Sequence, residues 1–337
     1  MFKAYLFPIS ARASRKVTNP YIENFINSLE DNFKFLNKNM PSQTGVFDVF
    51  RYINEVDYIF FHWPENIAER KQGIIQTLVL FFIIIIARLK GINIAYVVHN
   101  KISHSKKRHK TKRFIARMMA AKSRLLITHA GEGIDFIKSL TQKNKKVFFF
   151  PHPIDASGPS RKEKKDIDVL VWGNIAPYKG VHNFLARLKN QETQWNGTVL
   201  IAGKVSSPDY YQELISVKPG NVTILDDFID DDKLHTLINR SRIVLFPYHR
   251  KSILSSGAFA KTLAYPVHII GPACGAFLDF KELKHIHTFE TQNQIYDKIR
   301  EILSENYHEP DPEIIKKLKV DYSWISFGKA LKSYLNK

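Results

Sequence analysis

The stretch Val169–Val181, VLVWGNIAPYKGV, sets the expectation for the fold. An apolar run stops at Gly173, a polar turn with a proline follows, and after Lys179 and Gly180 a helical pattern of apolar residues begins. This order predicts a strand, a glycine turn and a helix. Glycine lets backbone approach a bound group closely, and a helix N-terminus presents N–H groups that suit phosphate. With Lys179 as a mobile cation, the stretch predicts a phosphate site; an ordinary strand-to-helix turn is the alternative.

Length and composition favour a two-domain protein. A chain of 337 residues exceeds one ordinary domain, and a hydrophobic content of 44% supports real cores. The single cysteine, Cys274, excludes an internal disulfide framework and fits a reducing compartment. The first ten residues, MFKAYLFPIS, lack a small-residue cleavage pattern, so we expect a first buried strand there and not a signal peptide.

The charge of the chain points to an anionic partner. A net charge of +18 at pH 7 favours nucleic acid, an acidic membrane face or phosphorylated substrates. From Arg70 to Gly131 there is no Asp or Glu, and this window contains the cluster KISHSKKRHKTKR at Lys101–Arg113. We expect the window to form an anionic docking surface, with a solvated loop and helix face as the alternative.

The first half of the sequence alternates apolar runs with helical patterns, which is typical of a parallel sheet covered on both faces. Asn19-Pro20 is expected to open the first helix, with Asn as the N-cap and Pro at the first helical position. The expected strands are Lys3–Pro8, Tyr58–Phe61, Ile94–Val98, Leu125–Thr128 and Val147–Phe150.

Histidines follow four of these strands: His62, His99, His129 and His152. Ligands of such sheets lie at the C-terminal ends of the strands, so the shared position favours a polar cleft; a buried structural role is the alternative for each. His99 is the first candidate for the reacting centre, because an imidazole can accept a proton near neutral pH, and His129 is the second. The scattered spacing does not resemble a metal site, and no metal is expected.

The most apolar segment, Ile74–Ala87, is shorter than the ~20 residues that span a bilayer. Its place between two strands predicts a buried crossover helix; a monotopic membrane contact beside the basic window is the alternative. The helical pattern that follows interleaves apolar with basic residues, as in helices that lie in a membrane interface. The residues expected to dock on a membrane are Lys106, Lys107, Arg108, Lys110, Lys112, Arg113 and Arg117.

The polar stretch DASGPSRKEKK, after which the alternation restarts, is the best linker candidate. Strands are expected at Asp168–Trp172, Gly197–Ala202, Val222–Leu225, Ile243–Phe246 and Val267–Ile270, and a helix at Asp230–Asn239. The expected organisation is a first domain at 1–154, a linker at 155–166, a second domain at 167–320 and a C-terminal helix at 321–337.

Several stretches, in this order, resemble those of GT-B glycosyltransferases, and most of all the family-4-like bacterial enzymes that build surface polysaccharides. They are VDYIFFHW, IAYVVHN, LLITHAG, VFFFPHPI, VWGNIAPYKGV, FIDDDKLHTLINRSRIVLFP, PYHRKSILSSGAFAKTLAYPVHII and DYSWISFGKALKSYL. The resemblance implies an α/β fold of two Rossmann-like αβα domains facing each other across a cleft. The first domain would bind the acceptor and the second the nucleotide sugar, with the C-terminal helix crossing back to the first.

The resemblance also implies roles for particular residues, with one departure. The wider family often has two glutamates eight positions apart on its donor-binding helix. Here those places hold Ile253 and Lys261, or Lys251 and Phe259 in a shifted alignment, and none is acidic. The implied donor contacts are Gly173, Asn174, Tyr178, Lys179, Gly180, Phe228, Tyr248, Arg250, Ser255, Ser256, Gly257 and Lys261; the implied acceptor contacts are Arg12, Arg15, Asn19, His62 and Asn100.

The leading hypothesis is therefore transfer of a sugar from a UDP- or GDP-linked donor to a lipid-linked saccharide acceptor in bacterial polysaccharide synthesis. The protein would lie in the cytoplasm on the inner face of the cell membrane and need no cofactor. Without a metal, Lys179, Arg250 and Lys251 must meet the charge that develops on the leaving diphosphate. Two alternatives are a non-catalytic GT-B-like partner protein, which the missing glutamates favour, and a nucleic-acid-binding protein, for which the sequence lacks a recognition motif.

Overall fold

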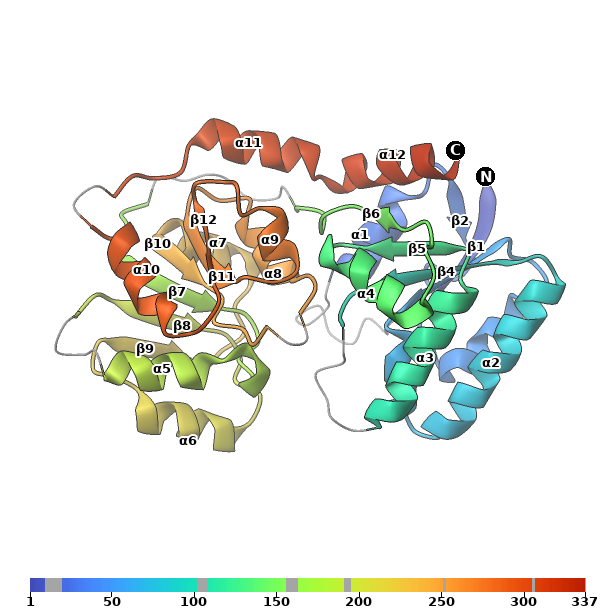
Figure 1. Ribbon diagram of the computed structural model, residues 1–337, viewed down its shortest axis with the longest axis horizontal. Coiled ribbons are helices and arrows are strands. Elements are labelled where there is room, and N and C mark those ends of the chain that lie inside the picture. The colour runs from blue at the N-terminus through green and yellow to red at the C-terminus, as the bar shows by residue number, and fades with distance from the viewer. Residues whose placement is uncertain are drawn as a thin grey trace. The chain divides into compact units, whose positions relative to one another are not determined.

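The computed structural model of the chain (Figure 1) describes residues 1–9, 20–101, 108–155, 163–190, 195–250, 253–304 and 307–336. It divides into two compact units. Unit 1 comprises Met1–Pro153 together with Trp324–Lys337, and unit 2 comprises Ile154–Ser323. Each unit is built around a parallel sheet of six strands.

The sheet of unit 1 has the strand order β2-β1-β3-β4-β5-β6. Its central strands β3, β4 and β5 are short, mostly apolar runs, as expected for strands of a sheet that is buried on both faces. The strands are β1 (Phe2–Phe7), β2 (Phe33–Phe35), β3 (Tyr58–His62), β4 (Asn93–Val98), β5 (Leu125–Thr128) and β6 (Phe148–Phe149).

The direction of the chain through this sheet decides which face each helix covers. From β3 to β6 every step goes the same way, so right-handed crossovers place the connecting helices α2 (Gly73–Leu89), α3 (His109–Lys122) and α4 (Glu132–Thr141) on one face (Figure 1). The step from β1 to β2 goes the other way, which places α1 (Tyr21–Ser28) on the opposite face. There α1 packs against α12 (Trp324–Leu335).

Two 3-10 segments complete the α2 side of unit 1. They are η1 (Gly45–Arg51) and η2 (Pro64–Glu69). Helix α2 packs on both of them and on β4, whereas α3 packs on η2, β4 and α4. The two helices are therefore neighbours over the same part of the sheet.

The sheet of unit 2 has the order β12-β11-β10-β7-β8-β9. The chain leaves β7 toward β8 and β9 and then returns to β10 on the other side of β7, so the winding reverses between β7 and β10. Ligands of doubly wound sheets bind at the carboxyl ends of strands at such a switch point. The strands are β7 (Ile167–Trp172), β8 (Val199–Ala202), β9 (Val222–Leu225), β10 (Ser241–Leu245), β11 (His268–Pro272) and β12 (Ile286–Phe289).

Seven α-helices and one 3-10 turn connect and flank these strands within the described residues of unit 2. The acidic N-terminus expected near Asp230 is present, since the Asp230 carboxylate accepts a hydrogen bond from Lys233 N at 2.8 Å. The elements are η3 (Pro177–Lys179), α5 (Val181–Lys189), α6 (Pro208–Val217), α7 (Asp231–Asn239), α8 (Gly257–Thr262), α9 (Ala276–Asp279), α10 (Gln294–Ile302) and α11 (Pro312–Asp321).

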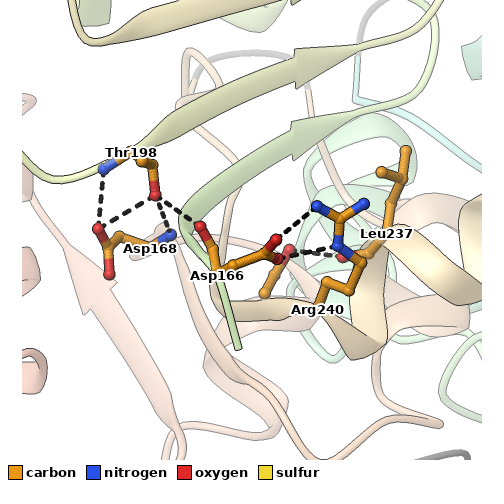
Figure 2. Close-up of polar contacts among 6 residues, drawn as sticks. Asp166, Asp168, Thr198, Leu237 and Arg240 are labelled. Carbon is orange, nitrogen blue, oxygen red and sulfur yellow. Dashed lines mark hydrogen bonds and ion pairs between the residues drawn. The ribbon is translucent and has the colours of Figure 1, made fainter. Parts of the chain in front are cut away.

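Polar contacts hold the amino ends of β7, β8 and β10 together (Figure 2). Arg240 donates to both oxygens of Asp166, at 2.9 and 2.6 Å. Thr198 N donates to the Asp168 carboxylate at 2.8 Å. These contacts lie at the edge of the sheet opposite the switch-point ends of β7 and β10. We therefore assign them to strand register and not to ligand binding.

The structure differs from the sequence predictions at several elements. The first helix begins at Tyr21 with Pro20 in the N-cap position, and Asn19 lies outside the described residues. The short strand β2 and the elements β12, α9 and α10 were not predicted from the sequence. The expected C-terminal helix is present as α12, which begins at Trp324, three residues later than expected, and α11 before it was not predicted.

The segment Ile74–Ala87 is a helix, as expected, but the expectation that it is buried was wrong. Only one side of α2 faces the sheet, and large apolar side chains on its other side are exposed. None of the helices in the described part of the chain is both long and apolar enough to cross a membrane.

Candidate functional site

The turn after β7 is built by glycines that no other residue could replace without strain. Gly173 has φ +105° and Gly203, after β8, has φ +148°. A Cβ on Gly203 would lie 1.8 Å from the carbonyl oxygen of Gly173. Gly180 has φ +73°, and a Cβ there would lie 2.1 Å from the carbonyl oxygen of Pro247. The chain segments that follow β7, β8 and β10 thus meet in backbone-to-backbone contact at the switch point.

Lys179 lies inside this turn as a buried cation. Its side chain is 8% exposed, and its Nζ lies 5.3 Å from the centre of the Tyr248 ring. Burial lowers its pKa. No described carboxylate lies within ion-pair distance of it. The expectation of a mobile cation was therefore wrong, because the side chain is packed under the turn. A buried ammonium without a carboxylate suits a bound anion.

The neighbouring cations of unit 2 are already paired. Arg250 forms an ion pair with Glu290 and donates to the carbonyl of Ala273 at 2.9 Å. Lys261 pairs with Asp231 at 2.5 Å. A diphosphate that bound to Arg250 or Lys261 would have to compete with the carboxylate already paired with it. Lys179 is therefore the best candidate for the phosphate-binding cation. Lys251 lies outside the described residues.

The other implied donor residues follow the same strand ends. Tyr248 is buried, which raises its pKa to about 12, and its hydroxyl lies 3.5 Å from Ser256 Oγ. Ser256 caps α8 by accepting from Phe259 N at 3.3 Å, with Ser255 before it and Gly257 as the first helical residue. Asn174 is exposed, Tyr178 is half-buried, and Phe228, after β9, keeps 46% of its surface exposed. An exposed aromatic ring at that place is free to stack on a nucleotide base.

In unit 1 the four histidines converge on one aromatic residue, Tyr21. Its ring centre lies 4.9 to 5.6 Å from those of His62, His99, His129 and His152. The ring centre of Trp324, on α12, lies 5.3 Å from that of Tyr21. The strand ends thus meet as the sequence predicted. The side chains of His62 and His129 are fully buried, so the cluster is closely packed and leaves no open cleft at these two residues.

His129, the second catalytic candidate, has no exposed surface in this packing. Its Nδ1 donates to the carbonyl of Phe150 at 2.9 Å, so the neutral ring accepts the Tyr21 hydroxyl proton at Nε2, 2.6 Å away. Burial lowers the pKa of His129 to about 3, and that of His62 also to about 3. His62, predicted to contact the acceptor, is likewise enclosed.

His99 is 7% exposed, whereas His62 and His129 are fully buried. It stacks on Trp63 with ring centres 4.1 Å apart, and its Nε2 lies 3.0 Å from His62 Nδ1. Burial and the neighbouring histidines lower its pKa well below the usual range. His99 is thus neutral at physiological pH and has little affinity for a proton. It is better placed to orient a group than to abstract a proton.

Sequence reasoning missed Glu65, two residues after Trp63. Its carboxyl is buried, and this burial raises its pKa to about 7. The Tyr96 hydroxyl donates to it at 3.5 Å. Glu65 and Asn100 line a cavity of about 190 Å³. A carboxyl that titrates near neutral pH in a cavity fits general-base chemistry better than the buried histidines do. A lone Glu after Trp63-Pro64 carries no sequence pattern that would have revealed it.

Among the residues expected to dock on a membrane, Lys110, Arg113 and Arg117 are exposed on α3. Lys112 is a correction: it is 3% exposed and pairs with Glu69 at 2.5 Å, so it cannot reach a surface. Arg108 is exposed, but one of its guanidinium nitrogens donates to the carbonyl of Ala68 at 2.8 Å. The remaining predicted residues that lie outside the described part of the chain are Arg12, Arg15, Lys106 and Lys107.

Solved structures share this architecture along the whole chain. HepE from Anabaena, solved with UDP and glucose, superposes with a TM-score of 0.73 at 13% sequence identity over 100% of both chains. The chain has the fold of GT-B glycosyltransferases. AviGT4, a glycosyltransferase of avilamycin A biosynthesis, gives a TM-score of 0.62 at 12% identity over 99% of this chain and 96% of that one. A glycosyltransferase from Rickettsia africae gives 0.64 at 11% identity, over 99% and 97%.

No protein-family model and no curated protein matches the sequence. The GT-B fold is thus visible in three dimensions at sequence identities too low for family comparison. Within the described ranges, no group of three or more His, Cys, Asp or Glu side chains could hold a metal ion.

Proposed function

We propose that this protein transfers a sugar from a nucleotide-diphosphate sugar to a saccharide acceptor. The observation that carries the proposal is Lys179: a buried ammonium with no described carboxylate near it, under a glycine turn at the switch point of a doubly wound sheet. The GT-B fold supports the same reaction class. HepE has been solved with UDP-glucose, which makes a UDP-linked donor the first to test, with a GDP-linked donor as the alternative.

The chemistry follows from the charges at the turn. An acceptor hydroxyl attacks the anomeric carbon, the bond from that carbon to the phosphate oxygen breaks, and the nucleoside diphosphate leaves with one additional negative charge. Lys179 is already desolvated, so it stabilises that charge without reorganising water. The turn amides around Gly173 add backbone dipoles. The acceptor proton passes to a base of unit 1, for which Glu65 has the most suitable pKa.

The acceptor belongs to unit 1 in this proposal, and we infer that it is a lipid-linked saccharide of bacterial polysaccharide synthesis at the inner face of the cell membrane. The support is the absence of Asp and Glu from Arg70 to Gly131 in a chain of net charge +18. A basic face attracts anionic lipid and holds the enzyme where such acceptors reside. We propose no cofactor beyond the nucleotide-sugar substrate.

One observation favours a second function. The donor-helix position where the wider family often has a glutamate is occupied by Lys261, which is bound to Asp231. A protein that holds the nucleotide without turning it over, as a partner in a polysaccharide assembly complex, would be consistent with that change.

Donor turnover tests the proposal and separates the two functions. The protein is incubated with UDP- and GDP-sugars and a bacterial membrane extract as acceptor source, and release of the nucleoside diphosphate is measured. We expect turnover with one donor class and a loss on the order of 10²–10³-fold in Lys179→Met. Lys189→Met, an exposed lysine on the following helix, is the matched control. Nucleotide binding without turnover would favour the partner protein, and neither binding nor turnover would refute both functions.

A further inference from the structure

Helix α2 leaves a continuous stripe of large apolar side chains exposed. The spacing of the stripe is that of one helix face, because its members recur every three or four residues over 16 residues of sequence, from Ile74 to Leu89. At a rise of about 1.5 Å per residue the stripe is roughly 22 Å long. Its members are Ile74 (65% exposed), Ile75 (51%), Leu78 (56%), Phe81 (44%), Phe82 (56%), Ile85 (40%) and Leu89 (82%).

The stripe is not a part of the core left uncovered by loose packing. The opposite face of α2 is complete, with Leu80, Ile83 and Ala87 fully buried. The polar residues on that side are satisfied: Thr77 Oγ1 donates to the carbonyl of Gly73 at 2.6 Å, and Gln76 accepts from Val46 N at 3.3 Å. Helix α2 is thus seated firmly on the unit while seven apolar side chains on its outer face remain in solvent. A contiguous apolar patch of this kind marks an interaction surface.

The charged residues of α2 and α3 are all basic. At the ends of α2, Lys71, Arg88 and Lys90 are exposed. On the neighbouring α3, Phe114 is a further exposed apolar residue, at 56%. Beside Phe114 on α3 lie the exposed cations Lys110, Arg113 and Arg117. No Asp or Glu occurs anywhere in the sequence between Arg70 and Gly131 to balance them.

We infer that the stripe of α2 inserts into an anionic lipid bilayer, with the helix lying in the plane of the interface and the cations of α2 and α3 on the headgroups. An apolar face flanked by Lys and Arg is the arrangement of helices that lie in this interface, buried about 5–10 Å deep. A second copy of the chain fits less well, because two such faces would bring their positive charges together. The inference rests on the proposed function and deepens it, because it gives the protein a surface for docking on the membrane that holds the lipid-linked acceptor. Its test requires no donor and no turnover.

Vesicle cosedimentation of the full chain tests the inference. The vesicles contain phosphatidylglycerol mixed with phosphatidylcholine, or phosphatidylcholine alone. We expect wild type to bind the anionic vesicles, and Leu78→Gln/Phe81→Gln/Phe82→Gln to bind on the order of 100-fold more weakly, because three half-exposed apolar side chains no longer leave water. The control Ile215→Gln/Leu278→Gln/Ile325→Gln, which changes exposed apolar residues on other helices, should bind like wild type.

A charge variant separates insertion from electrostatic adsorption. Lys110→Gln/Arg113→Gln/Arg117→Gln should weaken binding to anionic vesicles by about 100-fold, since each cation near the surface contributes roughly tenfold or less. Raised salt screens the cations, so it should abolish the electrostatic binding that the charge variant retains. Wild type should keep part of its binding in raised salt, because inserted side chains are not screened. Equal binding of wild type and the α2 variant would overturn the inference. The inference would also be overturned if wild type dimerised in the absence of vesicles and the α2 variant did not. Nucleotide binding should be unchanged in every variant, so failure here is distinct from failure of the proposed function.

Discussion

His62→Phe should make the protein less sensitive to acid, although it removes a hydrogen bond. The pKa values of His62 and His129 are lowered from 6.5 to about 3 by burial in the folded state. As the pH falls below 6.5 the unfolded chain therefore takes up protons that the folded chain refuses, and stability that was present above 6.5 is lost. At pH 5 the difference is about 1.5 pH units for each histidine, or roughly 2 kcal/mol each and about 4 kcal/mol together.

Hydrogen exchange of the β5 amides, at pH 7 and at pH 5 with rates corrected for intrinsic exchange, measures this loss inside unit 1. Wild type should lose about 2 kcal/mol more than His62→Phe between the two pH values. The comparison of slopes cancels the cost of the substitution itself and the opposite contribution of Glu65, which both proteins share. An equal loss in the two proteins would mean that His62 is not held neutral by burial, and would refute the reasoning.

The remaining predictions concern the glycine turn and Glu65. Gly203→Ala should lower the free energy of unfolding by about 3 kcal/mol or more, because its Cβ would lie 1.8 Å from the Gly173 carbonyl oxygen, whereas Gly91→Ala, at φ +72° with nothing within 4 Å, should cost only about 1 kcal/mol; urea unfolding compares them. Glu65→Gln should match wild type near pH 4 and be about 3 kcal/mol more stable at pH 9, because the raised pKa of about 7 means that stability present below 4.5 is lost as Glu65 ionises. Equal stability of Glu65→Gln and wild type at pH 9 would show that this carboxyl is not buried.

Apart from β2 and β12, the strands of the two sheets could be predicted from the sequence because they are continuous apolar runs ended by turns. Phe33–Phe35 could not, because three residues carry no readable pattern and β2 exists only through its pairing with β1. The glycine turn could also be predicted from local sequence, because Gly173 ends an apolar run and Gly180 precedes a helical pattern. In the structure both have positive φ. The partner of this turn, Gly203, lies 30 residues away and emerges only from the fold.

Burial is what the sequence could not supply. Hydrophobicity and a place between two strands identified α2 as a helix, but a side chain such as Phe82 has the same sequence signal whether it faces a core or a lipid. The histidines were identified from their positions after the predicted strands. Only the packing around Tyr21 shows that His129 is fully buried. Glu65 has an ordinary sequence context, and its raised pKa is created by the surrounding fold.

The measurement that tests the central claim most directly is a calorimetric comparison of a nucleoside diphosphate with its nucleoside: UDP with uridine, and GDP with guanosine. Each is titrated into wild type and Lys179→Met. We expect wild type to bind the diphosphate far more tightly than the nucleoside, and Lys179→Met to lose on the order of 100-fold in affinity for the diphosphate while its affinity for the nucleoside stays within about twofold. An unchanged preference for the diphosphate in Lys179→Met would contradict the assignment of Lys179 as the phosphate-binding cation of the donor site.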